Sequence, residues 1–280
     1  MNIAVTGASG FVGRAVMEWL NNTPEVNVIP ISRTNCDYSV ENLRTLLKGA
    51  DAVIHLAGVK GGTGSIRDFH VNEVTTENLL IAMGEEKVGR IVFASSRLVY
   101  SDVKAIPWEE SQRLDPPNMY GISKAACESL CRLYSKKYGF TYAAVRIAQV
   151  LGFGEGVRNM MNVFLETGLN HSQITVMGKS VAKRQYIYVE DLAEILCRLA
   201  EMQGTSGIYN VGMTEAYSNL EIAELINEAF GNTTPINYDD SFPETIQSSI
   251  MDVKRVMRET DYVPRDMRHA LDDMYAKYKK

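Results

Sequence analysis

The sequence predicts an α/β protein in which a doubly wound parallel sheet precedes a smaller C-terminal α/β lobe. Short β-branched, apolar runs alternate with amphipathic helical stretches through the first half of the chain, and a glycine-rich turn follows the first run. The length of 280 residues suits one large domain or two closely joined ones. Alternating strands and helices form β-α-β units, whose right-handed crossovers cover both faces of a parallel sheet.

The first half of the chain supplies the elements of that sheet. Strands are predicted where β-branched residues cluster, and helices where apolar residues recur every three to four positions. The predicted strands comprise residues 2–6, 26–31, 52–56, 90–94 and 141–150, and the predicted helices comprise residues 11–20, 72–83 and 120–138. We therefore assign residues 1–150 to the domain that holds the sheet.

After Gly152 the alternation loosens. Shorter strands are predicted at 174–177, 186–189 and 208–211, between helices at 189–202 and 218–230. Neither a repeat nor a low-complexity linker separates this part from the first half. We expect residues 151–280 to form mainly a substrate-binding lobe, with some segments returning to the first sheet.

Composition excludes several classes of function. With 45% hydrophobic and 22% charged residues, the chain is typical of a folded globular protein. Its formal net charge of −5 disfavours a nucleic-acid partner, because such a partner requires a basic surface. No apolar run approaches the roughly 18 residues that cross a bilayer, and no charged leader precedes the first strand. We expect a cytoplasmic protein with no membrane partner.

The cysteines and histidines show no spacing typical of a metal site, so we predict no metal. In a chain of this length, four cysteines do not suggest a disulfide framework. We interpret them as buried thiols; they are Cys36, Cys127, Cys131 and Cys197.

A glycine-rich turn, Thr6-Gly7-Ala8-Ser9-Gly10-Phe11-Val12-Gly13, lies between the first predicted strand and the first helix. The first glycine permits a sharp bend, the second lets the backbone approach a pyrophosphate, and the third lets the helix pack closely on the sheet. The helix N-terminus adds free N–H groups and a partial positive charge. This position predicts a Rossmann-type dinucleotide site; a merely tight turn is the alternative. The predicted cofactor contacts here are Gly7, Ser9, Gly10, Phe11, Val12 and Gly13.

The end of the second strand indicates which dinucleotide binds. An acidic residue about 20 residues beyond the last glycine would bind the ribose 2′-hydroxyl of NAD. Ser32 and Arg33 stand there instead, and they can hydrogen-bond and neutralise a 2′-phosphate. NADP is therefore favoured, with NAD as the alternative; an Arg33 that faces solvent without a ligand is the simpler interpretation.

The pattern Tyr-x-x-x-Lys is typical of a catalytic pair but occurs three times, as Tyr100/Lys104, Tyr120/Lys124 and Tyr275/Lys279. Only the second pair opens a long helix, where the i,i+4 spacing places both side chains on one face. That helix also precedes a predicted strand of the parallel sheet. We therefore select Tyr120 and Lys124.

Tyr120 is the predicted acid/base. A Lys124 ammonium close by, together with a positively charged nicotinamide ring, would favour the phenolate. The phenolate could take the carbinol proton while hydride moves to the cofactor, and return it in the reverse direction. Ser96 would hydrogen-bond the same substrate oxygen; the alternative for Ser96 is a hydroxyl that caps the end of a strand.

These residues resemble the extended short-chain dehydrogenase/reductases, also called the NAD-dependent epimerase/dehydratase family. The matching segments run in the family's order and are residues 6–13, His55-Leu-Ala-Gly58, Asn72, Ser95-Ser96-Arg-Leu-Val-Tyr100, Tyr120-Gly-Ile-Ser-Lys124, Arg146 and Arg184-Gln-Tyr-Ile-Tyr-Val189. The resemblance implies that Ser96, Tyr120 and Lys124 form a catalytic triad. It further implies cofactor contacts from Leu56, Ala57, Gly58 and Asp37, and a nucleotide-sugar diphosphate held by the Arg184 segment.

Departures from the family pattern reduce the number of activities that the chain could have. Arg97-Leu98 replaces the acidic pair of the dehydratase branch, which argues against a 4,6-dehydratase. Gln149 replaces an asparagine of the substrate site, and residues 246–250 contain no second arginine. The predicted substrate contacts are Ser96, Arg97, Gln149 and Arg184.

Three functions stay open. The first is NAD(P)-dependent oxidoreduction of a nucleotide-activated sugar at C4, by a 4-ketoreductase or a 4-epimerase, and Arg33 and the short chain favour reduction. The second is NADP-dependent reduction of a non-nucleotide carbonyl compound. The third is a non-catalytic NAD(P)-sensing protein, against which the complete Ser96, Tyr120 and Lys124 set argues.

The helices at 72–83 and 120–138 carry apolar faces, with Leu79, Leu80 and Met83 on one and Ala126, Leu130 and Leu133 on the other. One interpretation is that these faces cover the parent sheet. The resemblance implies instead that part of them forms a four-helix contact in a homodimer.

Overall fold

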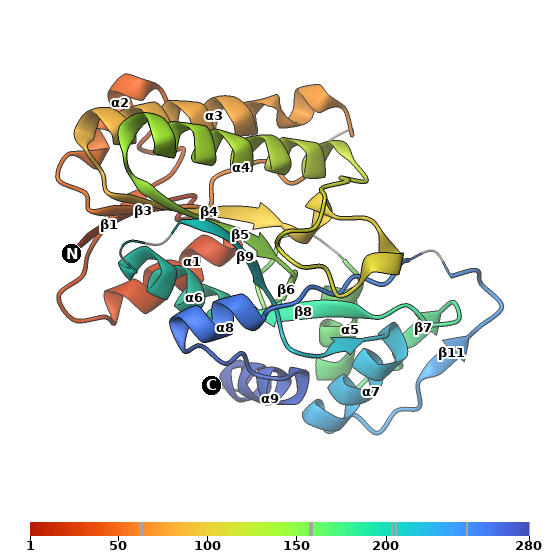
Figure 1. Ribbon diagram of the computed structural model, residues 1–280. Helices are drawn as coiled ribbons and strands as arrows, with labels where there is room; N and C mark the ends of the chain where they lie inside the picture. Colours follow the sequence, from red (N-terminus) through yellow and green to blue (C-terminus); the bar gives the residue numbers. More distant parts are fainter. Residues whose placement is uncertain (62–63, 157–158, 203, 205, 245, 280) are drawn as a thin grey trace.

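A parallel sheet of six strands forms the centre of the computed structural model, which describes residues 1–280 except 62–63, 157–158, 203, 205, 245 and 280 (Figure 1). The strands lie in the order β2-β1-β3-β4-β5-β9. The order changes direction between β1 and β3, which opens a crevice at their carboxyl ends. This confirms the predicted doubly wound sheet. The strands are β1 (Asn2–Thr6), β2 (Asn27–Ile31), β3 (Ala52–His55), β4 (Arg90–Ser96), β5 (Thr141–Ile147) and β9 (Gly207–Val211).

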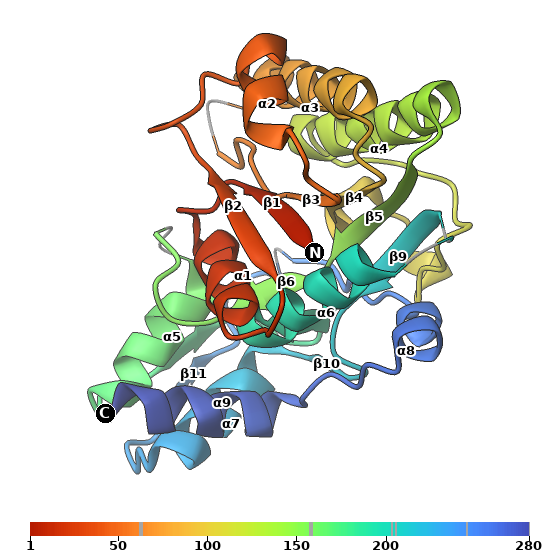
Figure 2. The same cartoon turned by 90° about the vertical axis from the view of Figure 1, so that its left-hand side faces the viewer.

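Helices cover both faces of the sheet, as Figures 1 and 2 show. One face carries α2 (Val40–Leu47), α3 (Ile66–Glu86) and α4 (Met119–Tyr138). The opposite face carries α1 (Phe11–Asn21) and α6 (Val189–Glu201), with α8 (Lys254–Thr260) beside β9. Each face has its own apolar core, because both surfaces of a parallel sheet are buried.

A smaller lobe lies beside the carboxyl ends of these strands (Figure 1). It contains a three-stranded sheet of order β10-β8-β6 and a two-stranded sheet of β11 and β7. Its apolar core also takes in Phe11, Val12 and Ala15 of α1, which joins the two parts of the molecule. Its elements are β6 (Gln149–Leu151), α5 (Met160–Leu169), β7 (Thr175–Met177), β8 (Arg184–Tyr188), β10 (Ala216–Tyr217), α7 (Asn219–Phe230), β11 (Asn237–Asp239) and α9 (Met267–Tyr278).

The predicted single strand at 141–150 was wrong, because two strands occupy this segment. The backbone N–H of Ala148 donates to Val211 in the large sheet, and the chain then leaves that sheet. From Gln149 onward it pairs with β8 of the smaller lobe. The apolar pattern continues through the break, since both strands bury their side chains.

The apolar faces of α3 and α4 divide into a buried and an exposed part. Leu79, Leu80 and Met83 are fully buried against the sheet, which confirms for them the interpretation that they cover it. Leu133 is 52% exposed. Val74 on α3 and Ile122 on α4 are also exposed.

The four cysteines are free and buried, as predicted. Within the described residues, no group of three or more His, Cys, Asp or Glu side chains is placed to hold a metal ion. The described helices include none that is long and apolar enough to cross a membrane.

Candidate active site

The turn between β1 and α1 can be built only with glycine at its key positions. Gly7 has a φ of +70°, and a Cβ there would lie 2.8 Å from the backbone nitrogen of Ala57. A Cβ on Gly13 would lie 2.1 Å from the carbonyl oxygen of Gly7. Gly10 occupies the N-cap position of α1 and carries no side chain to accept from the first turn. The first N–H groups of α1 are thus left as donors, which fits a dinucleotide phosphate.

A cleft of about 640 Å³ opens beside this turn. Nine of the predicted cofactor residues line it, namely Gly7, Ser9, Gly10, Ser32, Arg33, Asp37, Leu56, Ala57 and Gly58. The other five, Phe11, Val12, Gly13, Tyr120 and Lys124, are not among the lining residues. The side chains of Phe11 and Val12 pack on the core of the smaller lobe, so a phosphate could contact only their backbone.

The sequence interpretation left out the rest of the cleft wall. Thr34, Cys36 and Tyr38 extend it beyond β2, and Val59 extends it beyond β3. Val71, Asn72 and Thr75 close it from one face of α3. Their spacing of one, three and four residues was the signal that could have identified that helix face.

The loop after β2 is held by its own polar side chains. Asn35 Oδ1 accepts from the backbone N–H of Ser32 at 2.8 Å, and the hydroxyls of Ser32 and Thr34 are 2.7 Å apart. Asp37 accepts from the N–H and hydroxyl of Ser39, and these bonds keep the pKa of Asp37 below its usual value. Arg33 is exposed on the same rim of the cleft. The rim therefore presents an exposed cation, Arg33, and an ionised carboxylate, Asp37.

Tyr120 and Lys124 lie in the first two turns of α4. Asn118 caps this helix by accepting from the N–H of Gly121 at 2.9 Å. Lys124 is 5% exposed, and its Nζ donates to the carbonyl oxygen of Ala94 on β4 at 2.8 Å. The same Nζ lies 5.7 Å from the centre of the Tyr120 ring. The helix thus presents its ammonium beside the phenol and close to the end of β4.

The end of β4 continues into a 3₁₀ turn, η1 (Arg97–Val99), that is pressed against α4. Ser96 Oγ accepts from the N–H of Leu98 at 3.2 Å. A Cβ on Gly121 would lie 2.0 Å from the carbonyl oxygen of Leu98, so only glycine permits this approach. Ser96, Tyr120 and Lys124 are thereby brought to one end of the sheet.

The tyrosines of the other two Tyr/Lys pairs pack elsewhere in the protein. Tyr100 is buried and stacks on Trp108, with ring centres 5.1 Å apart. Tyr275 stacks on Phe230 in the smaller lobe, with centres 5.0 Å apart. Packing therefore removes both pairs from the cleft.

Asn72 links the cofactor cleft to the catalytic helix. Its Oδ1 accepts from the N–H of Val59 at 2.7 Å. Its Nδ2 lies 3.1 Å from the carbonyl oxygen of Val59 and 3.2 Å from Ser123 Oγ on α4. Asn72 is itself buried, so these contacts hold the loop after β3 beside α4.

His55 lies beneath this loop, fully enclosed. Its Nδ1 is 2.6 Å from Thr6 Oγ1, and its Nε2 is 3.1 Å from Thr76 Oγ1. Burial, and next the charge of Lys124, lower the pKa of His55 to about 3. The imidazole is therefore neutral near pH 7 and joins β3 to β1 and α3.

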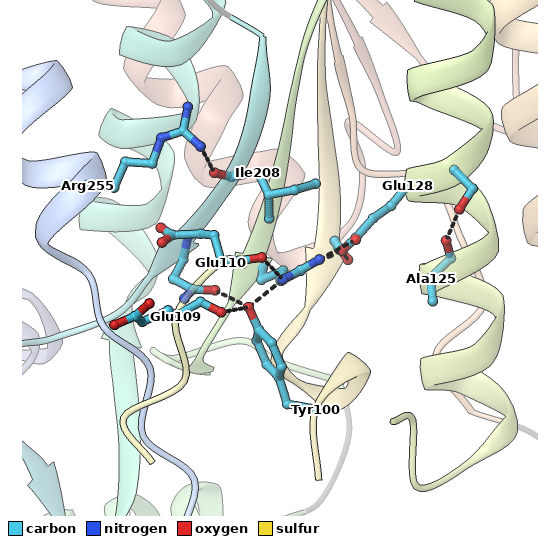
Figure 3. Close-up of polar contacts among 11 residues, drawn as sticks. Tyr100, Glu109, Glu110, Ala125, Glu128, Ile208 and Arg255 are labelled. Carbon is cyan, nitrogen blue, oxygen red and sulfur yellow. Dashed lines mark hydrogen bonds and ion pairs between the residues drawn. The ribbon is translucent and has the colours of Figure 1, made fainter. Parts of the chain in front are cut away.

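A buried ion pair between Glu128 of α4 and Arg146 of β5 holds this helix against the sheet close to the site (Figure 3). Arg146 Nη2 is 2.8 Å from Glu128 Oε2, and Arg146 Nε is 3.0 Å from Glu128 Oε1. Ser95 donates to the same carboxylate at 2.5 Å, and Arg146 also donates to the Tyr100 hydroxyl. The network joins β4, β5 and α4. The sequence interpretation missed Glu128, although it follows Lys124 by four residues on one helix face.

The predicted substrate residues converge from three strands. In the β4–β5 register Ser96 pairs with Ile147, and two residues further Gln149 pairs with Tyr186 of β8. Arg184 opens β8 and donates to Asn219 Oδ1 at 2.7 Å. Burial, followed by the charge of Arg184, lowers the pKa of Arg97.

Comparison with known proteins identifies relatives along the whole chain. A solved structure of UDP-N-acetylglucosamine 4-epimerase from Bacillus cereus is 34% identical with a TM-score of 0.94, and the match covers 100% of both chains. A putative UDP-glucose 4-epimerase of Methanocaldococcus jannaschii is 26% identical over 277 residues, 90% of each chain. A dTDP-4-dehydro-6-deoxyglucose reductase of Escherichia coli is 24% identical, over 94% of this chain and 92% of the relative.

A family model gives the same grouping. The model described as the NAD dependent epimerase/dehydratase family matches residues 3–212, which is more than half of the chain. The matched span contains the glycine turn, the cofactor cleft and the Tyr120/Lys124 helix. The chain therefore belongs to the NAD dependent epimerase/dehydratase family and is an NAD(P)-dependent enzyme.

Proposed function

We propose that the protein interconverts UDP-activated sugars at C4, as a nucleotide-sugar 4-epimerase. The observation that carries this proposal is the convergence of Ser96, Tyr120 and Lys124 at the end of the sheet beside the cofactor cleft, where Lys124 Nζ lies 3.7 Å from the position of a Cβ built on the cleft residue Gly58. The similarity to a UDP-sugar 4-epimerase over the full chain supports the substrate class and the position of the reaction.

Each residue has a defined chemical role in this proposal. NAD(P) bound in the cleft would supply the hydride-transfer chemistry at C4. Tyr120 as phenolate takes the proton of the C4 hydroxyl, and the phenol gives it back when the carbonyl is reduced. The Lys124 ammonium, held by Ala94, stabilises the phenolate by its charge. Ser96 hydrogen-bonds the C4 oxygen and holds it in line with Tyr120.

A 4-ketoreductase is the second candidate, and the rim of the cleft favours it. Ser32 and the exposed Arg33 would bind a 2′-phosphate, so we propose NADP as the preferred cofactor. An enzyme that consumes NADPH in each cycle suits reduction. An epimerase retains its cofactor through the cycle and gains less from a site selective for NADP.

In this proposal one part of the chain binds the cofactor and the other binds mainly the substrate. The domain of residues 1–150 holds the cofactor, with α6 and β9 of the second half added to its layers. The remainder of 151–280 binds mainly substrate, through Arg184, while Gln149 contributes from the end of the first domain. The Arg184 guanidinium would hold the diphosphate, because its planar fork matches phosphate oxygens.

We also propose a homodimer formed through α3 and α4. The two helices lie side by side on the outer face of the sheet (Figure 2). Their exposed Val74, Ile122 and Leu133 would be covered by the same helices of a second copy, as in an isologous contact.

One set of assays separates the candidates. Production of the C4 epimer from UDP-glucose or UDP-N-acetylglucosamine without added reductant would establish the epimerase. Loss of NADPH absorbance with a 4-keto-6-deoxy nucleotide sugar would establish the reductase. A rise in Tm with UDP is expected in both cases, because a ligand that binds only the folded state stabilises it. If neither UDP nor dTDP changes Tm, the result would count against the Arg184 assignment and favour a carbonyl substrate without a nucleotide.

A further inference from the structure

Arg97 and Arg184 have no acidic partner among the residues that the structure describes. Arg97 directly follows Ser96 at the start of η1, and Arg184 opens β8. Neither forms an ion pair with any described residue, and among those residues only Asn219 accepts a hydrogen bond from either side chain. Buried or half-buried charges in proteins are normally paired. Two uncompensated guanidinium groups therefore point to an anionic ligand.

The strand registers lead from the end of β4, which Arg97 directly follows, to β8. Ser96 lies beside Ile147, and the chain then continues to Gln149, which lies beside Tyr186. Tyr186 is two residues from Arg184 on β8, so the two side chains lie on the same face of that strand, and the charges of both Arg184 and Arg97 act on the Tyr186 hydroxyl. The three side chains thus belong to one site.

Three buried polar atoms at this site lack a partner in the described part of the chain. They are the Tyr186 hydroxyl, Ser249 Oγ and Arg184 Nε. Tyr186 is fully buried and Ser249 is 3% exposed. Ser249 pairs with Arg184 through an isolated bridge, so these atoms lie together. Unpaired buried donors are destabilising unless a ligand accepts from them.

We assign the two cations to different parts of one substrate. In the proposed function the diphosphate is held by Arg184. Arg97 directly follows Ser96, which would hold the C4 oxygen in the proposed function, so we place Arg97 at the sugar end of the substrate. A second cation beside the sugar is unnecessary for a neutral hexose, because its hydroxyls would not compensate the charge.

We propose that Arg97 binds a carboxylate carried by the sugar, so that the preferred substrate is an acidic nucleotide sugar such as a UDP-uronic acid. This inference rests on the proposed function and narrows its substrate class. A guanidinium pairs with a carboxylate through two parallel hydrogen bonds, which the hydroxymethyl group of a neutral hexose does not offer.

The test compares the affinities of the full chain, loaded with NAD(P), for UDP, UDP-glucose and UDP-glucuronic acid by calorimetry. The wild type should bind UDP-glucuronic acid at least tenfold more tightly than UDP-glucose. Arg97→Gln should remove most of this difference while changing the Kd for UDP less than threefold. Arg97→Lys should keep part of the preference, because it retains the charge without the fork. Arg132→Gln, which removes an exposed charge on α4, should change nothing.

Each alternative result is distinct. Equal wild-type affinity for the acidic and neutral sugars would overturn the inference and leave the proposed function intact. Equal weakening of all three ligands by Arg97→Gln would assign Arg97 to the diphosphate and also overturn it. Failure of the wild type to bind UDP or either sugar would contradict the proposed function itself. Unchanged NAD(P) affinity and Tm would establish that the variants are folded.

Discussion

Lys124 donates a hydrogen bond from its Nζ to the carbonyl oxygen of Ala94 over 2.8 Å. Ala94 lies two residues before Ser96 on β4, and Lys124 lies one helical turn after Tyr120 on α4. The bond therefore fixes the helix that carries the proposed acid/base relative to the strand that carries the proposed substrate serine. The predictions below concern the contacts that hold this arrangement and the chemistry it would perform.

Glu128→Gln should destabilise the protein strongly. The change removes the charge that compensates the buried Arg146 guanidinium, and breaking a buried ion pair in this way costs about 3–5 kcal/mol. Urea unfolding measures the difference. Glu85→Gln is the matched control, because its pair with Arg44 is exposed and its loss should leave stability almost unchanged. Equal effects of the two changes would contradict the role assigned to the buried pair.

Gly13→Ala should weaken cofactor binding and stability together. The added Cβ would lie 2.1 Å from the carbonyl oxygen of Gly7, so the turn or α1 must shift at a cost of about 1–3 kcal/mol. Gly89→Ala provides the control, since the nearest atom to its Cβ is 3.6 Å away. Calorimetric titration with NADP and NAD, together with Tm, distinguishes the variants. Normal cofactor affinity in Gly13→Ala would mean that the turn between β1 and α1 does not need glycine at this position.

His55 should make stability fall on acidification. Its pKa is about 3 in the folded state against 6.5 for the exposed side chain, so the unfolded chain binds the proton more readily. The contribution of His55 is complete above pH 6.5 and is lost as pH falls towards 3, at up to about 1.4 kcal/mol per pH unit. The free energy of unfolding of the wild type and of His55→Asn, measured from pH 7.5 to 5, tests this. The variant should show the shallower slope; identical slopes would exclude His55 as the cause.

Leu133→Glu should convert the proposed dimer into a monomer. Leu133 is 52% exposed on α4, and a charge there would be buried without a partner in a four-helix contact. Val263→Glu, at a residue that is 74% exposed and distant in sequence from both helices, should leave the dimer intact. Sedimentation at micromolar concentration gives the molecular mass. A wild-type mass of one chain, 31.2 kDa, would refute the dimer.

The sequence predicted those features that depend mainly on residues close together in the chain. The glycine spacing from Gly7 to Gly13 identified the turn, although the close approach that requires Gly7 is to Ala57, after β3, and only the approach of Gly13 to Gly7 is local. The helix with Tyr120 and Lys124 was identifiable because one helical turn places both residues on the same face. The selection of this pair over Tyr100 and Tyr275 agrees with the packing of the other two tyrosines.

Features that depend on long-range pairing were not visible in the sequence. The change of sheet at Ala148 depends on its bond to Val211, more than 60 residues away. The Glu128 and Arg146 pair likewise joins a helix to a strand, and neither residue has a local pattern that reveals its partner. The cleft wall formed by α3 was missed because its contribution depends on how Asn72 meets the loop at Val59.

The kinetics of Tyr120→Phe test the central claim most directly, because the change removes only the hydroxyl that would carry the proton. We predict that kcat for the nucleotide sugar falls by a factor of about 10²–10⁴, while the Kd for NAD(P), measured by calorimetry, changes less than threefold. Retention of wild-type turnover by Tyr120→Phe, with the cofactor bound normally, would contradict the assignment of Tyr120 as the acid/base.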